Sequence, residues 1–102
     1  SFTVKNMVTG TRNLNQQGYH LEQNIPNPFS DETTIHFTIP NPSGVRLKVY
    51  NMQGSLVKIL ADKKYSAGSH SLVFNRDHIP SGIYYLRMVS DEKHLTKQLI
   101  IK

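Results

Sequence analysis

From residue 19 onward, apolar and polar side chains alternate with a period of two in one short segment after another. Residues 33–39 are typical, because Ile35, Phe37 and Ile39 share one face while their neighbours are polar. This period predicts β-strands, and nowhere do apolar residues recur with a helical period over three turns, so we expect no substantial helix. The predicted strands span residues 19–22, 33–39, 45–50, 55–62, 71–75, 83–90 and 95–101.

Turn signals separate these segments at intervals of about eight to twelve residues. Gly54 can take the positive φ that closes a type I turn with a bulge, which makes residues 45–50 and 55–62 a hairpin. Segment 55–62 is apolar on both faces, and this fits either burial on both sides or a bulge that switches faces. The spacing predicts an all-β protein, a seven-stranded antiparallel β-sandwich of immunoglobulin-like type.

Residues 1–18 differ from the rest of the chain. Phe2 and Val4 alternate with polar neighbours like the end of a strand, and a polar, apolar-poor run follows. We interpret residues 1–18 as the tail of a preceding domain plus a flexible linker, and residues 19–102 as one domain. The chain opens at Ser1 without a signal peptide, and no apolar run is long enough to span a membrane. We therefore expect a fragment whose parent carries its export signal upstream.

The composition narrows the class of protein. The 102 residues include no cysteine, so a modest core must suffice without disulfides or thiolate metal sites. The net charge is +5, which could favour phosphate-rich surfaces such as lipopolysaccharide or nucleic acid. The basic residues are scattered, however, and Lys63-Lys64 is the only basic doublet. We interpret them as solvated surface residues and expect no nucleic acid partner.

No pattern of catalytic or metal-binding residues emerges. The five histidines are too far apart along the chain to form a local metal pair. Asp31-Glu32 and Asp91-Glu92 fall at expected turns, where carboxylates bond to main-chain amides. There is no nucleophile elbow and no phosphate-binding glycine loop. We therefore expect no enzyme activity, no catalytic residues, no cofactor and no metal.

Residues 21–29 form the most informative segment, Leu-Glu-Gln-Asn-Ile-Pro-Asn-Pro-Phe. Pro26 and Pro28 each fix their own φ at about −65° and push the preceding residue toward the extended region. The segment is therefore predicted to be a stiff, extended lead-in to the β domain.

Further features follow this lead-in in a fixed order. They are Thr33-Thr34-Ile35, Val49-Tyr50-Asn51-x-x-Gly54-x-x-Val57, Ala67-Gly68-x-His70, Pro80-Ser81-Gly82-x-Tyr84 and the closing stretch from Lys97 to Lys102. Together with the lead-in, the set resembles the type A C-terminal sorting domain of the Bacteroidetes type IX secretion system over residues 19–102. No single motif is decisive, but the ordered set is specific.

This resemblance implies a delivery signal. In the family, the parent protein crosses the periplasm, the outer-membrane translocon recognises the folded sorting domain, and a surface sortase usually removes it. The cargo domain lies upstream in the same chain and ends secreted or at the cell surface, either released or attached to lipopolysaccharide. The attachment concerns the cargo and not this domain, which is a sortase substrate without catalysis of its own.

The resemblance also assigns candidate recognition residues. They are Pro26, Asn27, Pro28, Gly82, Tyr84, Lys97, Leu99, Ile100, Ile101 and Lys102. For the prolines, Gly82 and Tyr84 we favour a structural role, whereas an exposed Lys102 suits recognition. We expect the translocon to read the last strand, residues 95–102, by strand addition, and an exposed edge strand could also pair two copies.

Two other readings stay open. One is an immunoglobulin-like carbohydrate-binding module, whose aromatic platform would come from Tyr50, Tyr65 or Tyr85. The doublet Tyr84-Tyr85 could likewise be an interaction pair, although alternation more simply places one tyrosine in the core. The other is a structural module of the flagellar-hook-capping type, which can occupy any position in its parent, whereas a sorting signal must end at the natural C-terminus.

Overall fold

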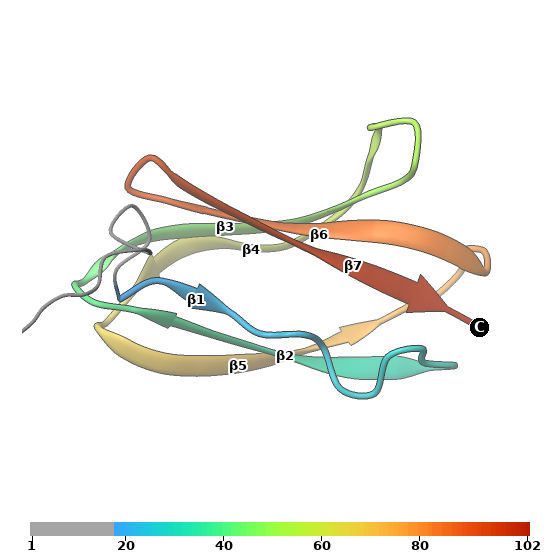
Figure 1. Cartoon of the computed structure of the whole chain (residues 1–102), viewed down its shortest axis with the longest axis horizontal. Helices are drawn as coiled ribbons and strands as arrows, with labels where there is room; N and C mark the ends of the chain where they lie inside the picture. Colours follow the sequence, from blue (N-terminus) through green and yellow to red (C-terminus); the bar gives the residue numbers. More distant parts are fainter. Residues whose placement is uncertain (1–17) are drawn as a thin grey trace, which may run out of the picture.

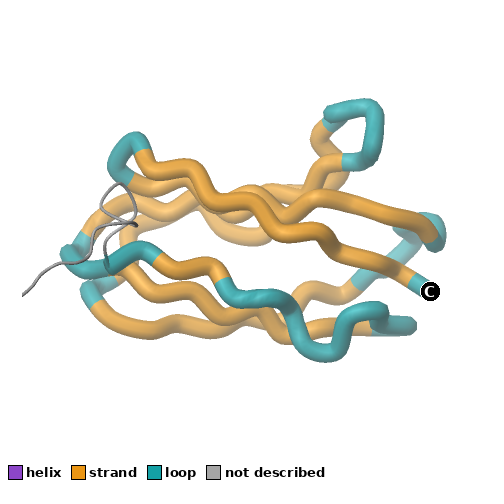
Figure 2. Tube along the Cα trace, in the orientation of Figure 1, coloured by secondary structure: helices purple, strands orange, loops and turns teal. Residues whose placement is uncertain are grey.

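The computed structural model describes residues 18–102, which form two antiparallel β-sheets stacked face to face (Figure 1). The strands are β1 (His20–Leu21), β2 (Glu32–Ile39), β3 (Ser43–Tyr50), β4 (Leu56–Tyr65), β5 (Gly68–Asn75), β6 (Gly82–Ser90) and β7 (Lys93–Ile101). One sheet has the order β1-β2-β5 and the other β4-β3-β6-β7. The predicted all-β immunoglobulin-like sandwich is confirmed, and no helix occurs in residues 18–102 (Figure 2). The tail and linker predicted at residues 1–18 lie outside the described part except for Gly18.

The core lies between the two sheets and consists of the inward-facing members of the predicted alternation. Phe29 and Phe74 pack edge to face with ring centroids 5.7 Å apart. Burying a side chain of this size stabilises the fold by about 1.5–3 kcal/mol, so the core is the main stabilising feature. Its members are Tyr19, Leu21, Phe29, Ile35, Phe37, Ile39, Val45, Leu47, Val49, Phe74, Tyr84, Leu86, Met88, Leu99 and Ile101.

Strand β4 resolves the ambiguity of its sequence in favour of bulges. Its pairing with β3 shifts register twice, between Leu47 and Lys48 and again between Val49 and Tyr50. Leu56 and Ile59 remain about half exposed, at 49% and 50%. Burial on both faces was therefore the wrong alternative, because β4 is an edge strand whose outer face no other layer covers.

Glycine and acidic residues occupy turn positions with positive φ. Gly54 has φ +87° and donates its main-chain N–H to the Asn51 carbonyl at 3.0 Å, which confirms the predicted hairpin turn. This hairpin rises away from the sandwich in Figure 1. Asp91 and Glu92 both have positive φ, 47° and 67°, in the tight connection between β6 and β7.

The lead-in departs from its predicted course. The chain bends at residues 26–28, and the peptide bonds before Pro26 and Pro28 are both cis. The expectation of an extended segment is therefore wrong at these positions, because proline restricts φ but leaves the isomer of its peptide bond open. Strands β5 and β7 also begin earlier than predicted, since Gly68 pairs with Ile39 and Lys93 pairs with Ser90.

Candidate functional site

The lead-in runs alongside the end of β7 and binds it through main-chain hydrogen bonds. Phe29 donates its N–H to the Ile100 carbonyl at 3.1 Å, and Lys102 donates its N–H to the Phe29 carbonyl at 2.8 Å. Phe29 and Ile101 thereby form a parallel bridge. The Asn27 side chain adds an acceptor, because its Oδ1 receives the Ile100 N–H at 2.9 Å. The far edge of β7 is thus covered at this end by a segment about seventy residues earlier in the chain.

A buried polar cluster holds the lead-in in its bent course. Asn24 is 1% exposed and Thr33 is also 1% exposed. The Asn24 Nδ2 group donates to the Pro26 carbonyl and to Thr33 Oγ1, both at 3.0 Å, and Thr33 Oγ1 donates to the same carbonyl at 2.8 Å. Gln23 Nε2 donates to Asn24 Oδ1 and also to the Gln98 carbonyl on β7. Because a buried polar group without a partner is costly, this cluster fixes the path of residues 24–33.

Arg76 joins three separate segments and was not singled out by the sequence analysis. Its guanidinium donates to the carbonyls of Ser30 and Lys102 at 3.0 and 2.9 Å and to the Ile79 carbonyl at 3.1–3.2 Å. Ser81 Oγ also donates to the Lys102 main-chain oxygen. A lone arginine after a strand carries no sequence signal for this role, since its acceptors, three main-chain carbonyls and the Ser81 hydroxyl, are brought together only by the fold.

Most of the predicted recognition residues meet at one end of the sandwich. Gly82 pairs with Ile101 and Tyr84 pairs with Leu99 in the β6–β7 ladder, next to the lead-in. Lys97 lies farther along β7, opposite Leu86. The side chains differ in exposure: Tyr84, Leu99 and Ile101 are buried, Asn27, Gly82, Lys97 and Ile100 are intermediate, and Pro26, Pro28 and Lys102 are exposed.

A sequence profile of the family described as "Secretion system C-terminal sorting domain" matches residues 24–102. The chain belongs to this family of type IX sorting domains. Searches of curated proteins and of solved structures give no match. The family is a secretion tag, so the sorting domain acts on its own parent chain and interacts with the type IX machinery. The parent protein is accordingly exported to the cell surface or secreted.

Tyr84 anchors this end of the sorting domain from inside. Its ring is buried, as predicted, and its hydroxyl donates to the Pro80 carbonyl at 2.7 Å, which satisfies its polar end. Gly82 has φ +152°, a value that L side chains rarely adopt, so a residue with a Cβ would be strained there. Both residues therefore have a structural reason to be present.

The rest of the β7 edge faces a small hollow. Main-chain N–H or C=O groups of residues 98, 100 and 102 point toward the lead-in. Because these groups alternate in direction along a strand, the main-chain groups of His94 and Thr96 point out of the same edge of β7. There they meet a hollow of about 280 Å³ between β1 and β7, lined also by Tyr19 and Leu21. Strand β1 already lies against β7 on this side, so an added strand has little room.

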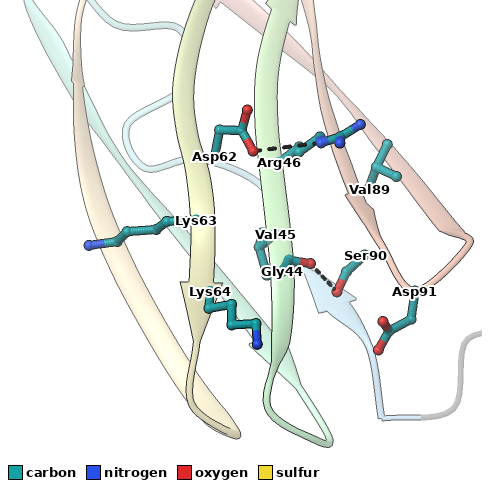
Figure 3. A pocket seen from close by; sticks show the side chains of 9 residues that line it. All are labelled: Gly44, Val45, Arg46, Asp62, Lys63, Lys64, Val89, Ser90 and Asp91. Carbon is teal, nitrogen blue, oxygen red and sulfur yellow. Dashed lines mark hydrogen bonds and ion pairs between the residues drawn. The ribbon is translucent and has the colours of Figure 1, made fainter.

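A second hollow of about 410 Å³ lies over Gly44, where the sheet carries no side chain (Figure 3). Figure 3 shows Lys64 beside Gly44, whereas Lys63 points away on the other side of β4. Arg46 pairs with Asp62 at 3.6 Å, and Ser90 Oγ donates to the Gly44 carbonyl at 2.9 Å. Basic and acidic side chains both line this hollow, so its charge favours neither anions nor cations.

Two ionisable groups have shifted pKa values. Burial, together with hydrogen bonding to Asp91 and the charge of that residue, raises the pKa of Tyr19. The hydrogen bond and charge of Lys58 lower the pKa of Asp77.

Within residues 18–102, no group of three metal-ligating side chains occurs, and no helix is long and apolar enough to cross a membrane.

Proposed function

We propose that this chain directs an upstream cargo domain through the periplasm to the type IX outer-membrane translocon and is then removed by a surface sortase. The observation that carries the proposal is the family match over residues 24–102. Cargo attachment to lipopolysaccharide or its release belongs to the sortase step, and the domain supplies no catalytic group. The domain boundary at residue 19 is part of the same proposal, because Tyr19 and Leu21 are the first residues of the core.

The recognition residues divide into two groups under this proposal. Pro26, Pro28, Gly82 and Tyr84 act by maintaining the fold, and the buried side chains of Leu99 and Ile101 do the same. Recognition then falls to accessible side chains, namely Lys97, Ile100 and Lys102, with Asn27 positioning Ile100. Strand addition along residues 98–102 is less favoured than side-chain recognition, because the lead-in already occupies those main-chain groups.

Deletion of residues 99–102 would therefore be an ambiguous test, since it removes two core side chains together with the tail. Point variants separate the two effects. Lys97→Ala with Lys102→Ala should reduce export while leaving thermal unfolding unchanged, and Lys63→Ala with Lys64→Ala provides a control of equal charge. Equal export by the two double variants would show that Lys97 and Lys102 take no part in recognition.

The overall proposal is tested by fusing residues 1–102 behind a fluorescent protein that carries a periplasmic export signal. In a strain with an intact type IX system, we expect fluorescence at the surface or in the medium and a loss of about 10 kDa from the fusion. A translocon-null strain should retain the uncleaved fusion in the periplasm. Retention in both strains would reject the sorting function.

A carbohydrate-binding role has one specific observation in its favour. Tyr50 and Tyr85 are directly opposite each other on β3 and β6, and both are partly exposed. Tyr65 does not extend this platform, because its ring packs against Phe37 and His70. Binding of the purified chain to a glycan array, lost on Tyr85→Ala, would support this alternative.

Pairing of two copies through an edge strand would use β4 or β5, since the outer edge of β7 is largely covered. Strand β4 carries two bulges and three lysines, which are features that oppose edge pairing. Analytical ultracentrifugation over a range of concentrations tests a homodimer directly.

A further inference from the structure

The outer face of the four-stranded sheet presents side chains in rows that cross all four strands. The inward neighbours Leu47, Val49, Leu86 and Met88 are buried, so the residues between them point outward. Residues in one row lie close enough to act as a single surface. The three complete rows are Leu56–Tyr50–Tyr85–Gln98, Ile59–Lys48–Arg87–Thr96 and Asp62–Arg46–Val89–His94. We call these twelve positions the basic face.

Three cationic residues, Arg46, Lys48 and Arg87, lie on this face. Arg46 is paired with Asp62, the single acid of the three rows. The two ion pairs found in residues 18–102 leave Lys48 and Arg87 without a carboxylate partner. Arg87 instead donates to His94 Nδ1 at 2.9 Å.

The opposite outer face, on the β1-β2-β5 sheet, has a different character. Its paired rows contain no lysine or arginine and consist of Glu32–Asn75, Thr34–Val73, His36–Ser71 and Thr38–Ser69. The two outer faces of the sandwich therefore differ in charge.

Apolar and aromatic groups adjoin the two unpaired cations. Leu56 and Ile59 are half exposed beside them. Tyr50 and Tyr85 form the central cross-strand pair, and Ile83 pairs with Ile100 just beyond it. Tyrosine and arginine flanked by aliphatic side chains are the composition enriched at protein interfaces.

We propose that the basic face is a docking surface for an acidic protein partner, in which carboxylates meet Lys48 and Arg87 and apolar side chains cover Tyr85 and Ile59. The inference rests on the sorting function and adds a second contact area beyond the end of the sandwich where the lead-in meets β7. Opposite charges speed the encounter, and the apolar neighbours supply area for a stable contact.

Charge reversal tests the face in the fluorescent fusion. Lys48→Glu with Arg87→Glu should lower export at least about tenfold, which corresponds to the loss of one strong contact. Lys63→Glu with Lys93→Glu makes the same change in net charge outside the three rows, opposite Val45 and Ser90, and should leave export within about twofold of the parent. Circular dichroism melting curves check that both variants fold.

The outcomes separate the two claims. No export of the unchanged fusion rejects the sorting function and the docking surface with it. Normal export by the Lys48→Glu, Arg87→Glu variant, or an equal loss with the control pair, rejects the docking surface alone. The variant Lys48→Arg with Arg87→Lys keeps both positive charges, so it should be exported as well as the unchanged fusion.

A photo-crosslinker in place of Tyr85 then identifies the protein that contacts the face during export. Replacing aspartate or glutamate by lysine at the crosslinked site of that protein should restore export of the Lys48→Glu, Arg87→Glu variant. Failure of every such charge exchange would contradict an acidic partner. Sedimentation with vesicles containing phosphatidylglycerol tests whether the face binds a membrane instead of a protein. Vesicle binding that depends on Lys48 and Arg87 would assign the face to a membrane and overturn the proposal.

Discussion

Single polar side chains decide how the lead-in is held against the sandwich. Asn24 satisfies the Pro26 carbonyl and the Thr33 hydroxyl inside the molecule, and Asn27 satisfies an amide of β7. An apolar residue in place of Asn27 would leave the Ile100 amide unpaired, and one in place of Asn24 would remove two hydrogen bonds from the buried cluster. Conformation matters at the same scale, since Glu92 adopts a positive φ that costs a residue with a Cβ about 1–2 kcal/mol.

Replacing Asn24 by alanine should lower the free energy of unfolding by about 1–3 kcal/mol, because it removes both donors of a buried amide. Urea denaturation followed by tyrosine fluorescence measures the change. Asn41→Ala is the matched control, since Asn41 is exposed and its substitution should change stability by less than about 0.5 kcal/mol. Equal effects of the two variants would contradict the role of the polar cluster.

Replacing Glu92 by glycine should raise the free energy of unfolding by about 0.5–1 kcal/mol. Glycine adopts φ near +67° without the steric cost of a Cβ, and Asp-Gly is a preferred pair in two-residue hairpin connections. Thermal unfolding measures the gain. Glu92→Ala removes the same charge but keeps the Cβ, so it should give no gain; a gain shared by both variants would point to charge instead of backbone conformation.

At the scale of elements, the edge of β7 is covered by a segment that is not itself a regular strand. Residues 23–29 bond to residues 98–102 through main-chain and side-chain groups. Arg76, which follows β5, ties this junction to the start of β6 through three carbonyl oxygens. The end of the chain is thus held by three elements from different parts of the sequence.

Replacing Arg76 by alanine should destabilise this junction by about 1.5–3 kcal/mol, the usual range for hydrogen bonds made by a charged donor. Hydrogen exchange of the Ile100 and Lys102 amides should accelerate, while amides in the centre of β3 keep their protection. Arg87→Ala removes an exposed arginine from the outer face and should leave both amides protected. Unchanged exchange in Arg76→Ala would show that the lead-in alone holds the tail.

At the scale of the whole molecule, contacts between the two sheets determine which conditions the fold tolerates. Tyr19, just before β1, donates its hydroxyl to Asp91 in the β6–β7 turn at 3.0 Å and so connects the layers. Burial and the neighbouring carboxylate favour the protonated phenol and raise its pKa. A raised pKa means that the associated stability is present below the ordinary value of about 10 and is lost as the pH rises through the folded value.

The unsubstituted sorting domain should therefore lose stability on going from about pH 8 to about pH 11. Tyr19→Phe should lose less over the same interval, because its ring carries no ionisable hydroxyl. Denaturation midpoints at the two pH values measure the difference, and the other tyrosines titrate in both proteins. Identical pH dependence in the two chains would contradict a role for Tyr19.

The period-two pattern by itself determined the existence of the strands, the inward faces of those that alternate and the all-β sandwich. It did so because each strand must bury one face, and alternation records which residues do so. Thus Ile35, Phe37, Leu47, Leu86 and Met88 were all assigned correctly. The ordered motifs also indicated the family, since they mark turns and strand entries whose spacing the fold constrains.

Only the tertiary structure decided how distant segments meet. The bend of the lead-in, the choice of bulges in β4 and the role of Arg76 depend on partners far away in the sequence, and no local pattern encodes such partners. The same holds for the basic face, because Lys48 and Arg87 become neighbours only through the register of β3 and β6. Local periodicity reports burial, whereas hydrogen bonding and surface charge depend on which strands the fold places side by side.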